Sequence, residues 1–195
     1  MTVATRKLTG EALREKLDDL ARLRIEIFRS WPYLYKGNIA YEREYLPRYA
    51  EGKTGTMIVA ETVDRIVGAS TALGLDEEDD YIQKPFIDAG MKLDEIFYFG
   101  ESVLLPEYRG LGLGVEFFKA REAAARAHGY KYAAFCAVER PLDHPARPKD
   151  YVPLDEFWKK RGYTKRPDLV AKFSWRDIGE RDESEKPMIY WMKTL

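Results

Sequence analysis

Residues 104–114 read Leu104-Leu105-Pro106-Glu107-Tyr108-Arg109-Gly110-Leu111-Gly112-Leu113-Gly114. They follow the apolar run Ile96 to Leu105, which predicts a buried strand, and they lead into a helical pattern from Gly112 to His128. Glycines leave backbone N–H groups unshielded, and a helix N-terminus carries about half a positive charge. The segment therefore predicts a site for a pyrophosphate, to which Arg109 adds a charged contact.

Other readings of the glycine-rich segment are less favoured. A phosphate-binding loop of the Walker type needs Gly-Lys-Ser/Thr at the helix start, and Val115 and Glu116 stand there instead. A dinucleotide-binding fingerprint requires another glycine spacing and an early position in the chain. A glycine turn that binds nothing is disfavoured, because three glycines in five residues weaken a helix start.

Taken as a whole, the sequence predicts one α/β domain over residues 1–195. The expected element order is β-α-α-β-β-β-α-β-α-β-β, a mixed sheet flanked by helices with a parallel crossover at 96–138. Strands are expected at 3–8, 56–62, 65–75, 96–105, 132–138, 169–175 and 188–192; helices at 11–29, 41–50, 112–128 and 154–161; and an acidic, solvated loop at 76–80.

Composition excludes several classes of protein. The formal net charge is −1, from 32 basic and 33 acidic residues, so the basic excess typical of nucleic-acid binders is absent. The single cysteine, Cys136, cannot form an intramolecular disulfide or a cysteine-based zinc cluster. No apolar run approaches the ~20 residues that span a bilayer, and the first residues do not form a signal peptide. We expect a cytoplasmic protein without nucleic-acid or membrane partners.

The segment around Arg109 resembles the acetyl-coenzyme A motif of the GNAT superfamily of N-acetyltransferases, whose core is Arg/Gln-x-x-Gly-x-Gly/Ala. Arg109, Gly112 and Gly114 occupy its three defining positions. The resemblance extends over the chain, through two helices after the first strand, a β-hairpin and a last helix. That helix ends in Phe157-Trp158-Lys159-Lys160-Arg161-Gly162-Tyr163, which is similar to the family's aromatic-x-x-x-Gly-aromatic pattern. The resemblance implies a largely antiparallel GNAT-like sheet.

The same resemblance implies how acetyl-CoA would bind. Backbone amides of the glycine-rich segment would hold the pyrophosphate, and backbone groups at the end of the motif strand would pair with the pantetheine arm. Trp158 and Lys159 would lie against the cofactor, although Lys159 and Lys160 are equally well read as solvated surface. The implied cofactor-binding residues are Val103, Leu104, Arg109, Gly110, Leu111, Gly112, Leu113, Gly114, Trp158 and Lys159.

For the base that deprotonates the amine, the resemblance points to a carboxylate on the motif strand. Glu101 is the only charged residue between Phe97 and Leu105, and a carboxylate inside a strand is costly unless it is paired or used. The alternative is that Glu101 forms a structural ion pair or faces the solvent. The residue that would protonate the departing CoA thiolate is not identified by the sequence, because Trp158 stands where many relatives have tyrosine. The candidate proton donors are Tyr151, which is our first choice, Tyr163 and His144. The fourth possibility is that the thiolate leaves without a proton donor.

The acceptor site is implied by the family to lie between segments 31–41, 139–151 and 176–187. The first is rich in aromatic residues, which suit a small amine. From these segments Tyr33, Tyr35, Glu139 and His144 are the candidate acceptor residues, and the plain alternative is that the tyrosines cover the core. Asp143 and His144 alone do not make a metal site, so no metal is expected.

The function predicted from the sequence is acetyl-CoA-dependent transfer to a primary amine of a small molecule, by direct attack in a ternary complex. The alternatives are a protein N-terminal or lysine acetyltransferase and a non-catalytic acyl-CoA sensor. A homodimer is raised by analogy alone.

Overall fold

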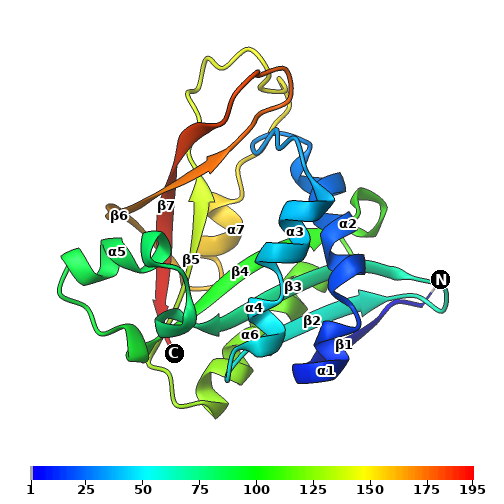
Figure 1. The fold of residues 1–195 in the computed structure, drawn as a ribbon, viewed down its shortest axis with the longest axis vertical. Helices are drawn as coiled ribbons and strands as arrows, with labels where there is room; N and C mark the ends of the chain where they lie inside the picture. Colours follow the sequence, from blue (N-terminus) through cyan, green and yellow to red (C-terminus); the bar gives the residue numbers. More distant parts are fainter. Residues whose placement is uncertain (1) are drawn as a thin grey trace.

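A computed structural model describes residues 2–195 and shows a seven-stranded sheet in the order β1-β2-β3-β4-β5-β7-β6 (Figure 1). All neighbouring strands are antiparallel except β4 and β5, which are parallel. The strands are β1 (Ala4–Leu8), β2 (Thr56–Glu61), β3 (Ile66–Gly74), β4 (Ile96–Leu104), β5 (Tyr132–Val138), β6 (Thr164–Trp175) and β7 (Ser184–Thr194). The mixed, largely antiparallel sheet predicted from the sequence is confirmed.

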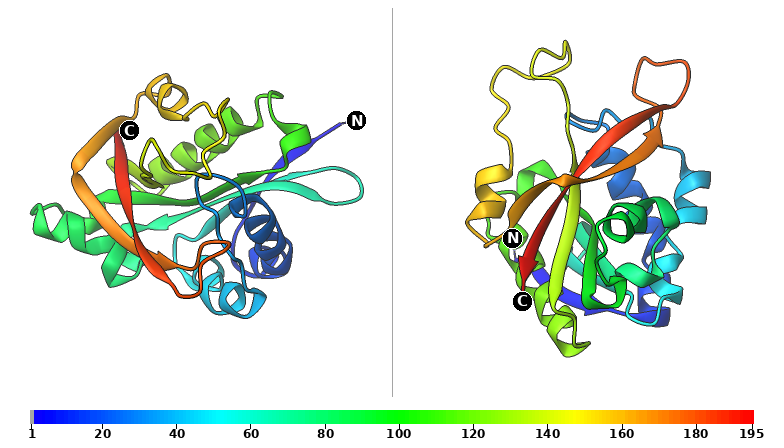
Figure 2. Two further views of the ribbon diagram at one scale, coloured as in Figure 1. Left: turned by 90° about the horizontal axis from the view of Figure 1, so that it is seen from above. Right: turned by 90° about the vertical axis from the view of Figure 1, so that its left-hand side faces the viewer.

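Helices cover both faces of this sheet. They are α1 (Gly10–Arg14), α2 (Leu17–Phe28), α3 (Ile39–Tyr45), α4 (Arg48–Glu51), α5 (Asp80–Asp88), α6 (Leu113–Ala127) and α7 (Asp155–Lys159), with short 3₁₀ turns at Leu75–Glu77, Leu93–Glu95 and Pro106–Tyr108. Figure 2 shows α1 to α4 on one face and α6 with α7 on the other. None of the helices within residues 2–195 has the length and apolar character needed to cross a bilayer.

Two predicted helices are each divided in the structure. The helix expected over 11–29 is α1 and α2, because α1 packs against α4 and β2 while α2 packs against β3 and β4. The helix expected over 41–50 is α3 and α4, separated at Pro47, which lacks the N–H that a continuous helix needs.

The prediction of a solvated loop over 76–80 is wrong in part, although residues 76, 79 and 80 are exposed. A 3₁₀ turn and the start of α5 occupy these residues, and the Glu78 side chain is buried, with Oε2 accepting a hydrogen bond from Arg48 at 3.0 Å. The arginine that pairs with this carboxylate belongs to α4, 30 residues earlier in the chain. The two closing strands are also longer than predicted, since β6 continues through a register irregularity between Arg166 and Val170.

The parallel pair β4 and β5 is short. Only Ile96–Tyr98 pair with Tyr132–Ala134, after which the two strands separate (Figure 1). β4 remains paired with β3, and β5 remains paired with β7, so a wedge opens between two halves of one sheet. This wedge positions the candidate site.

Burial of Glu78 predicts a pH-dependent stability. Burial raises the pKa of its carboxyl to about 7 from an ordinary value of 4.5, against the opposing effect of Arg48. Between these values the folded protein holds a proton that the unfolded chain has released. The free energy of unfolding should therefore fall as pH rises from about 4.5 to about 7, by up to about 3 kcal/mol.

Urea unfolding of Glu78→Gln at pH values across this window tests the assignment. The variant should lose the decline and exceed the wild type in stability above neutral pH. Asp80→Asn, which changes an exposed carboxylate two residues away, should keep the wild-type pH dependence. Parallel curves for Glu78→Gln and the wild type would contradict the assignment.

Candidate active site

The glycine-rich segment forms a cluster of free backbone donors. Among residues 2–195, the N–H groups of Gly110 to Gly114 find no hydrogen-bond acceptor, while Val115 and Glu116 donate to the carbonyl of Gly112. The cluster stands at the N-terminus of α6, the 15-residue helix that follows β4. Free amides and the positive end of a helix together form a site for an anion.

Two of these glycines are required by the backbone. Gly110 has a φ of +79° and Gly112 a φ of +83°, which L-residues with a side chain rarely adopt. Gly112 is the residue that begins α6. Gly114 has no such requirement, because a Cβ there would lie at van der Waals distance, 3.4 Å, from Cζ of Phe157 on α7. The exposed Arg109 folds back so that its Nη2 donates to the carbonyl of Leu104 at 3.4 Å.

A cavity of about 840 Å³ opens on the opposite side of the wedge. Its inner wall contains Glu101 of β4 and Cys136 of β5, the strands that separate there. Aromatic side chains supply much of the rest, and charged side chains from segments 172–176 and 181–183 stand at its outer part. The aromatic lining residues are Phe28, Tyr33, Tyr35, Tyr41, Tyr45, Tyr81, Tyr98, Phe173 and Trp175.

A β-bulge aims Glu101 into this cavity. Ser70 pairs with Ser102 and Ala72 with Phe99, so Gly100 and Glu101 together oppose Thr71. The Thr71 hydroxyl accepts from the backbone N–H of Glu101 at 2.9 Å and donates to its Oε2. Glycine is needed at position 100, because a Cβ there would lie 2.0 Å from the Tyr49 hydroxyl oxygen and 2.7 Å from Thr71 Oγ1.

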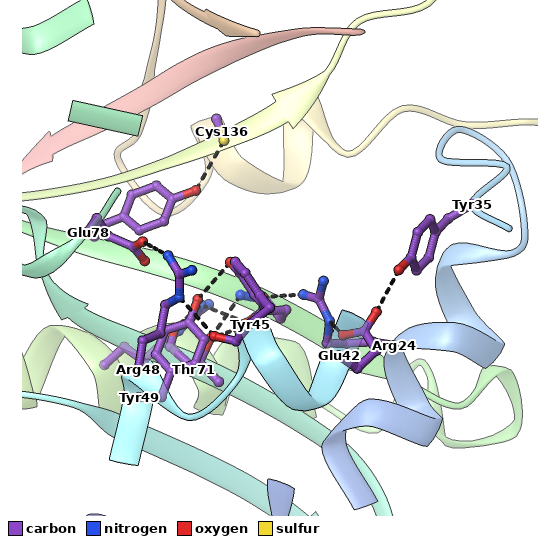
Figure 3. A network of polar contacts seen from close by, with 12 residues as sticks. Arg24, Tyr35, Glu42, Tyr45, Arg48, Tyr49, Thr71, Glu78 and Cys136 are labelled. Atoms are coloured by element: carbon purple, nitrogen blue, oxygen red, sulfur yellow. Dashed lines mark hydrogen bonds and ion pairs between the residues drawn. The ribbon is translucent and has the colours of Figure 1, made fainter. Parts of the chain in front are cut away.

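One arginine joins two buried carboxylates at the cavity wall (Figure 3). Arg24 Nε donates to Glu42 Oε2 at 2.6 Å, and its Nη1 donates to Glu101 Oε1. The Tyr35 hydroxyl donates to the other Glu42 oxygen at 2.9 Å. Burial opposes the charge on Arg24, but Glu101 and Glu42 outweigh it and raise the pKa of the guanidinium well above its ordinary value. One guanidinium thus serves two buried carboxylates.

A second buried ion pair holds the loops around the cavity together. Arg140, after β5, pairs with Asp177 at 2.7 Å and donates to the carbonyls of Pro32 at 2.9 Å and Tyr33 at 2.8 Å. Lys186 of β7 lies 3.3 Å from the same Asp177. The three segments that were expected to form the acceptor site are therefore linked, although 139–151 supplies none of the cavity-lining residues within the described chain.

The residues predicted from the sequence divide into two groups. Glu101, Tyr33 and Tyr35 line the cavity. His144 and Tyr151 instead lie against Trp31, with ring centroids 5.0 and 6.0 Å away. The acceptor role of His144 and the catalytic role of Tyr151 stay predictions.

The other predicted side chains lie at the edges of the site. Glu139 is exposed and pairs with Lys165 at 2.8 Å, so its acceptor role also stays a prediction. Trp158 packs with its ring 5.1 Å from Phe135 and from Trp191. Lys159 is exposed and pairs with Glu156 at 2.8 Å.

Sequence reasoning missed Arg24, Glu42 and the Arg140–Asp177 pair. The signal for Arg24 was its place on the apolar stripe of the predicted first helix, where a charged residue needs a buried partner. Glu42 is fully buried on α3 and gave no such sign, because the helix around it is polar.

Comparison with known proteins defines the class. The sequence model of the acetyltransferase (GNAT) family matches residues 17–163, and the chain belongs to this family. It is a GNAT-type acetyltransferase, and the family uses acetyl-CoA as acyl donor to amines. No curated protein matches the sequence.

Solved structures show the same fold at low sequence identity. A ribosomal-protein-alanine N-acetyltransferase from Brucella melitensis aligns with a TM-score of 0.63 and 12% identity, over 98% of this chain and 99% of that chain. A polyamine N-acetyltransferase from Drosophila melanogaster aligns with a TM-score of 0.62 and 13% identity, over 100% of both chains. An acetyltransferase from Streptococcus agalactiae aligns with a TM-score of 0.58 and 17% identity, over 99% and 98%.

Removing one partner of the Arg140–Asp177 pair should destabilise the protein. Arg140→Met leaves the carbonyl of Pro32 without its guanidinium donor and Asp177 with Lys186 as its remaining cation, and such losses cost about 1–3 kcal/mol. Chemical unfolding measures the change, with Lys149→Met, an exposed residue of the same loop, as control. A loss below about 1 kcal/mol for Arg140→Met would contradict the role of this pair.

Proposed function

We propose that the protein transfers the acetyl group of acetyl-CoA to a primary amine of a small molecule, by direct attack in a ternary complex. The observation that carries the proposal is the aromatic cavity that ends at Glu101, in the wedge between β4 and β5. The donor site and the cavity lie on opposite sides of the wedge, so a thioester held in the wedge would meet an amine from the cavity.

The donor site is proposed from the free amides of Gly110 to Gly114. These N–H groups would bind the pyrophosphate, and Arg109 would leave the Leu104 carbonyl to add a charged contact. The edge of β4 beyond Tyr98 has no strand partner on its β5 side, which leaves the backbone of Val103 and Leu104 open to the pantetheine arm. Trp158 and Lys159 would border the same arm from α7.

The inner part of the cavity suits an amine acceptor. Glu101 places a carboxylate at the inner wall of the cavity, which the amine group of an acceptor could approach. The lining aromatics already contact a cation, since the Arg24 guanidinium lies 4.8 Å from the ring centroid of Tyr45. A cavity of this size suits a small molecule.

Glu101 is proposed as the proton acceptor. Its carboxylate lines the cavity and is fixed at both oxygens, by Arg24 and by Thr71. The amine nitrogen would lose a proton to Glu101 as it bonds to the carbonyl carbon of the thioester. The bulge turns the Glu101 side chain toward the cavity, and the contacts with Arg24 and Thr71 hold its carboxylate there.

Closing the donor site should abolish binding of acetyl-CoA. Gly114→Glu places a carboxylate among the amides that would hold the pyrophosphate, and we expect at least about a 100-fold loss of affinity by calorimetry. Gly114→Ala is the matched control, because its Cβ fits at 3.4 Å from Phe157 and it should bind within a few-fold of the wild type. Equal affinity of Gly114→Glu and the wild type, with both folded, would refute the donor site.

Glu101→Gln should lower turnover without affecting the donor. Loss of a general base reduces kcat by roughly 10²–10⁴-fold at neutral pH, while calorimetry should show unchanged acetyl-CoA affinity. Glu183→Gln, at the outer part of the same cavity, is the control and should keep kcat. Wild-type kcat in Glu101→Gln would show that another group takes the proton.

A further inference from the structure

The cavity proposed for the acceptor has charged groups at both ends. Glu101 is buried at the inner wall, while the half-buried Arg176 and the exposed Lys36 line the outer part. We propose that the acceptor is a small primary amine with an acidic group at its far end, and that Lys36 and Arg176 bind this group. The inference rests on the proposed function and names the substrate class of the same site.

Lys36 and Arg176 lie directly opposite each other on two backbone segments that are far apart in the chain. Tyr35 and Asp177 form an antiparallel bridge, and the N–H of Lys36 donates to the carbonyl of Arg176 at 2.8 Å. Side chains of directly opposite residues leave the same side of such a ladder, with their Cβ atoms about 5 Å apart. Two like charges in this position repel each other and weaken the pairing.

Neither of these cations has a partner that offsets the repulsion. Among residues 2–195, the Lys36 ammonium and the Arg176 guanidinium form no ion pair, hydrogen bond or contact with an aromatic ring. Other cations of the same cavity are paired, since Arg24 contacts two buried carboxylates and Lys172 lies 3.2 Å from Glu185. The opposed pair therefore offers an open position for an anion.

The carboxylates nearest in the chain do not fill that position. Asp177, which follows Arg176, is buried and pairs with Arg140 at 2.7 Å. The exposed segment 181–183, which contains one arginine, one aspartate and one glutamate, also lines the cavity, but none of its side chains forms an ion pair within the described chain. An acidic group of a ligand would thus meet no competing carboxylate at Lys36 and Arg176.

Hydrogen bonds hold the two backbone segments together around the cation pair. The N–H of Ile178 donates to the carbonyl of Leu34 at 2.7 Å, and Trp175 Nε1 donates to the carbonyl of Tyr33 at 2.9 Å. The backbone positions of both cations are therefore fixed before a ligand arrives. Binding then loses little conformational freedom apart from that of two long side chains.

A guanidinium and an ammonium side by side suit a carboxylate or a phosphate. Arginine presents parallel N–H donors that match two oxygens of either group, and lysine adds a compact charge. At the other end of the cavity, the Glu101 carboxylate repels an acid and attracts an amine. A ligand with an amine at one end, an acid at the other and an apolar spacer along the aromatic walls would enter in one orientation, with its amine toward the wedge.

The cation pair is separate from the proposed donor site. The free amides of residues 110–114 lie at the N-terminus of α6, across the wedge from the cavity. We therefore assign Lys36 and Arg176 to the acceptor and not to the pyrophosphate of acetyl-CoA.

The first test compares acceptors that differ only at the end remote from the amine. The aromatic set is para-aminomethylbenzoate, para-methylbenzylamine and para-xylylenediamine, and the aliphatic set is ε-aminocaproate, hexylamine and hexamethylenediamine. In at least one set, kcat/KM should be about tenfold higher for the acid than for the neutral amine, and lowest for the diamine. A neutral amine or a diamine that is used as well as the acid in both sets would overturn the proposal. Replacing the benzoate by para-aminomethylbenzylphosphonate shows which of the two anions is bound better.

Substitutions test the two cations themselves. Arg176→Met and Lys36→Met should each raise the KM of the acid about tenfold with little change in kcat, and should leave the neutral amine within about twofold. Arg176→Lys should restore part of the loss, because it keeps the charge without the paired donors. Lys172→Met removes a cation of the same cavity that already has a partner, so it is the control and should leave both acceptors unchanged. Equal effects of Arg176→Met on the acid and on the neutral amine would overturn the proposal.

Urea unfolding separates ligand binding from a structural role. Because opposed like charges destabilise the fold, both Met variants should unfold at the wild-type urea concentration or above it. A lower midpoint for either variant would show that the cation stabilises the fold, and would overturn its assignment to a ligand.

The two inferences fail in different ways. A wild-type protein that binds acetyl-CoA but acetylates none of these amines would contradict the proposed function, and the substrate class would fall with it. A wild-type protein that acetylates neutral amines as well as their acidic counterparts would leave the function intact and remove only the role of Lys36 and Arg176.

Discussion

β4 and β5 are hydrogen-bonded over only three residue pairs, from Ile96 to Tyr98 on one strand, and each then follows its other neighbour. Every part of the candidate site is arranged around this separation. The glycine-rich segment and α6 follow β4 on one side of the wedge, and the aromatic cavity lies on the other. The Tyr98–Cys136 hydrogen bond joins the two strands near the point where their pairing ends.

Charge at the cavity wall follows from the same geometry. The bulge at Gly100 and Glu101 turns a carboxylate inward, and a buried carboxylate is costly unless it is paired. Arg24 pairs with it and also with Glu42, so one guanidinium holds two buried carboxylates in place. The carboxylate of Glu101 at the inner wall is the physical reason to expect an amine there.

The sequence predicted those features that depend on local pattern. The strand–glycine–helix segment, the sheet class and the isolated Glu101 were all visible, because turn chemistry and apolar periodicity are local. The pairs that shape the cavity were not visible, because they join residues far apart in the chain. Arg24 meets Glu101 across 77 positions, and Arg140 meets Asp177 across 37. Helix α5 was also missed, since its acidic first residues resemble a solvated loop until Arg48 is placed beside Glu78.

The central claim is that one wedge brings an acyl donor and an amine together. The most direct measurement is mass spectrometry of the wild-type protein incubated with acetyl-CoA and a panel of small primary amines. The account predicts that at least one amine gains an acetyl group while an equal amount of CoA is released. Saturable binding of acetyl-CoA with every amine unmodified would contradict it, and would instead favour a protein that senses acyl-CoA or acts on another protein.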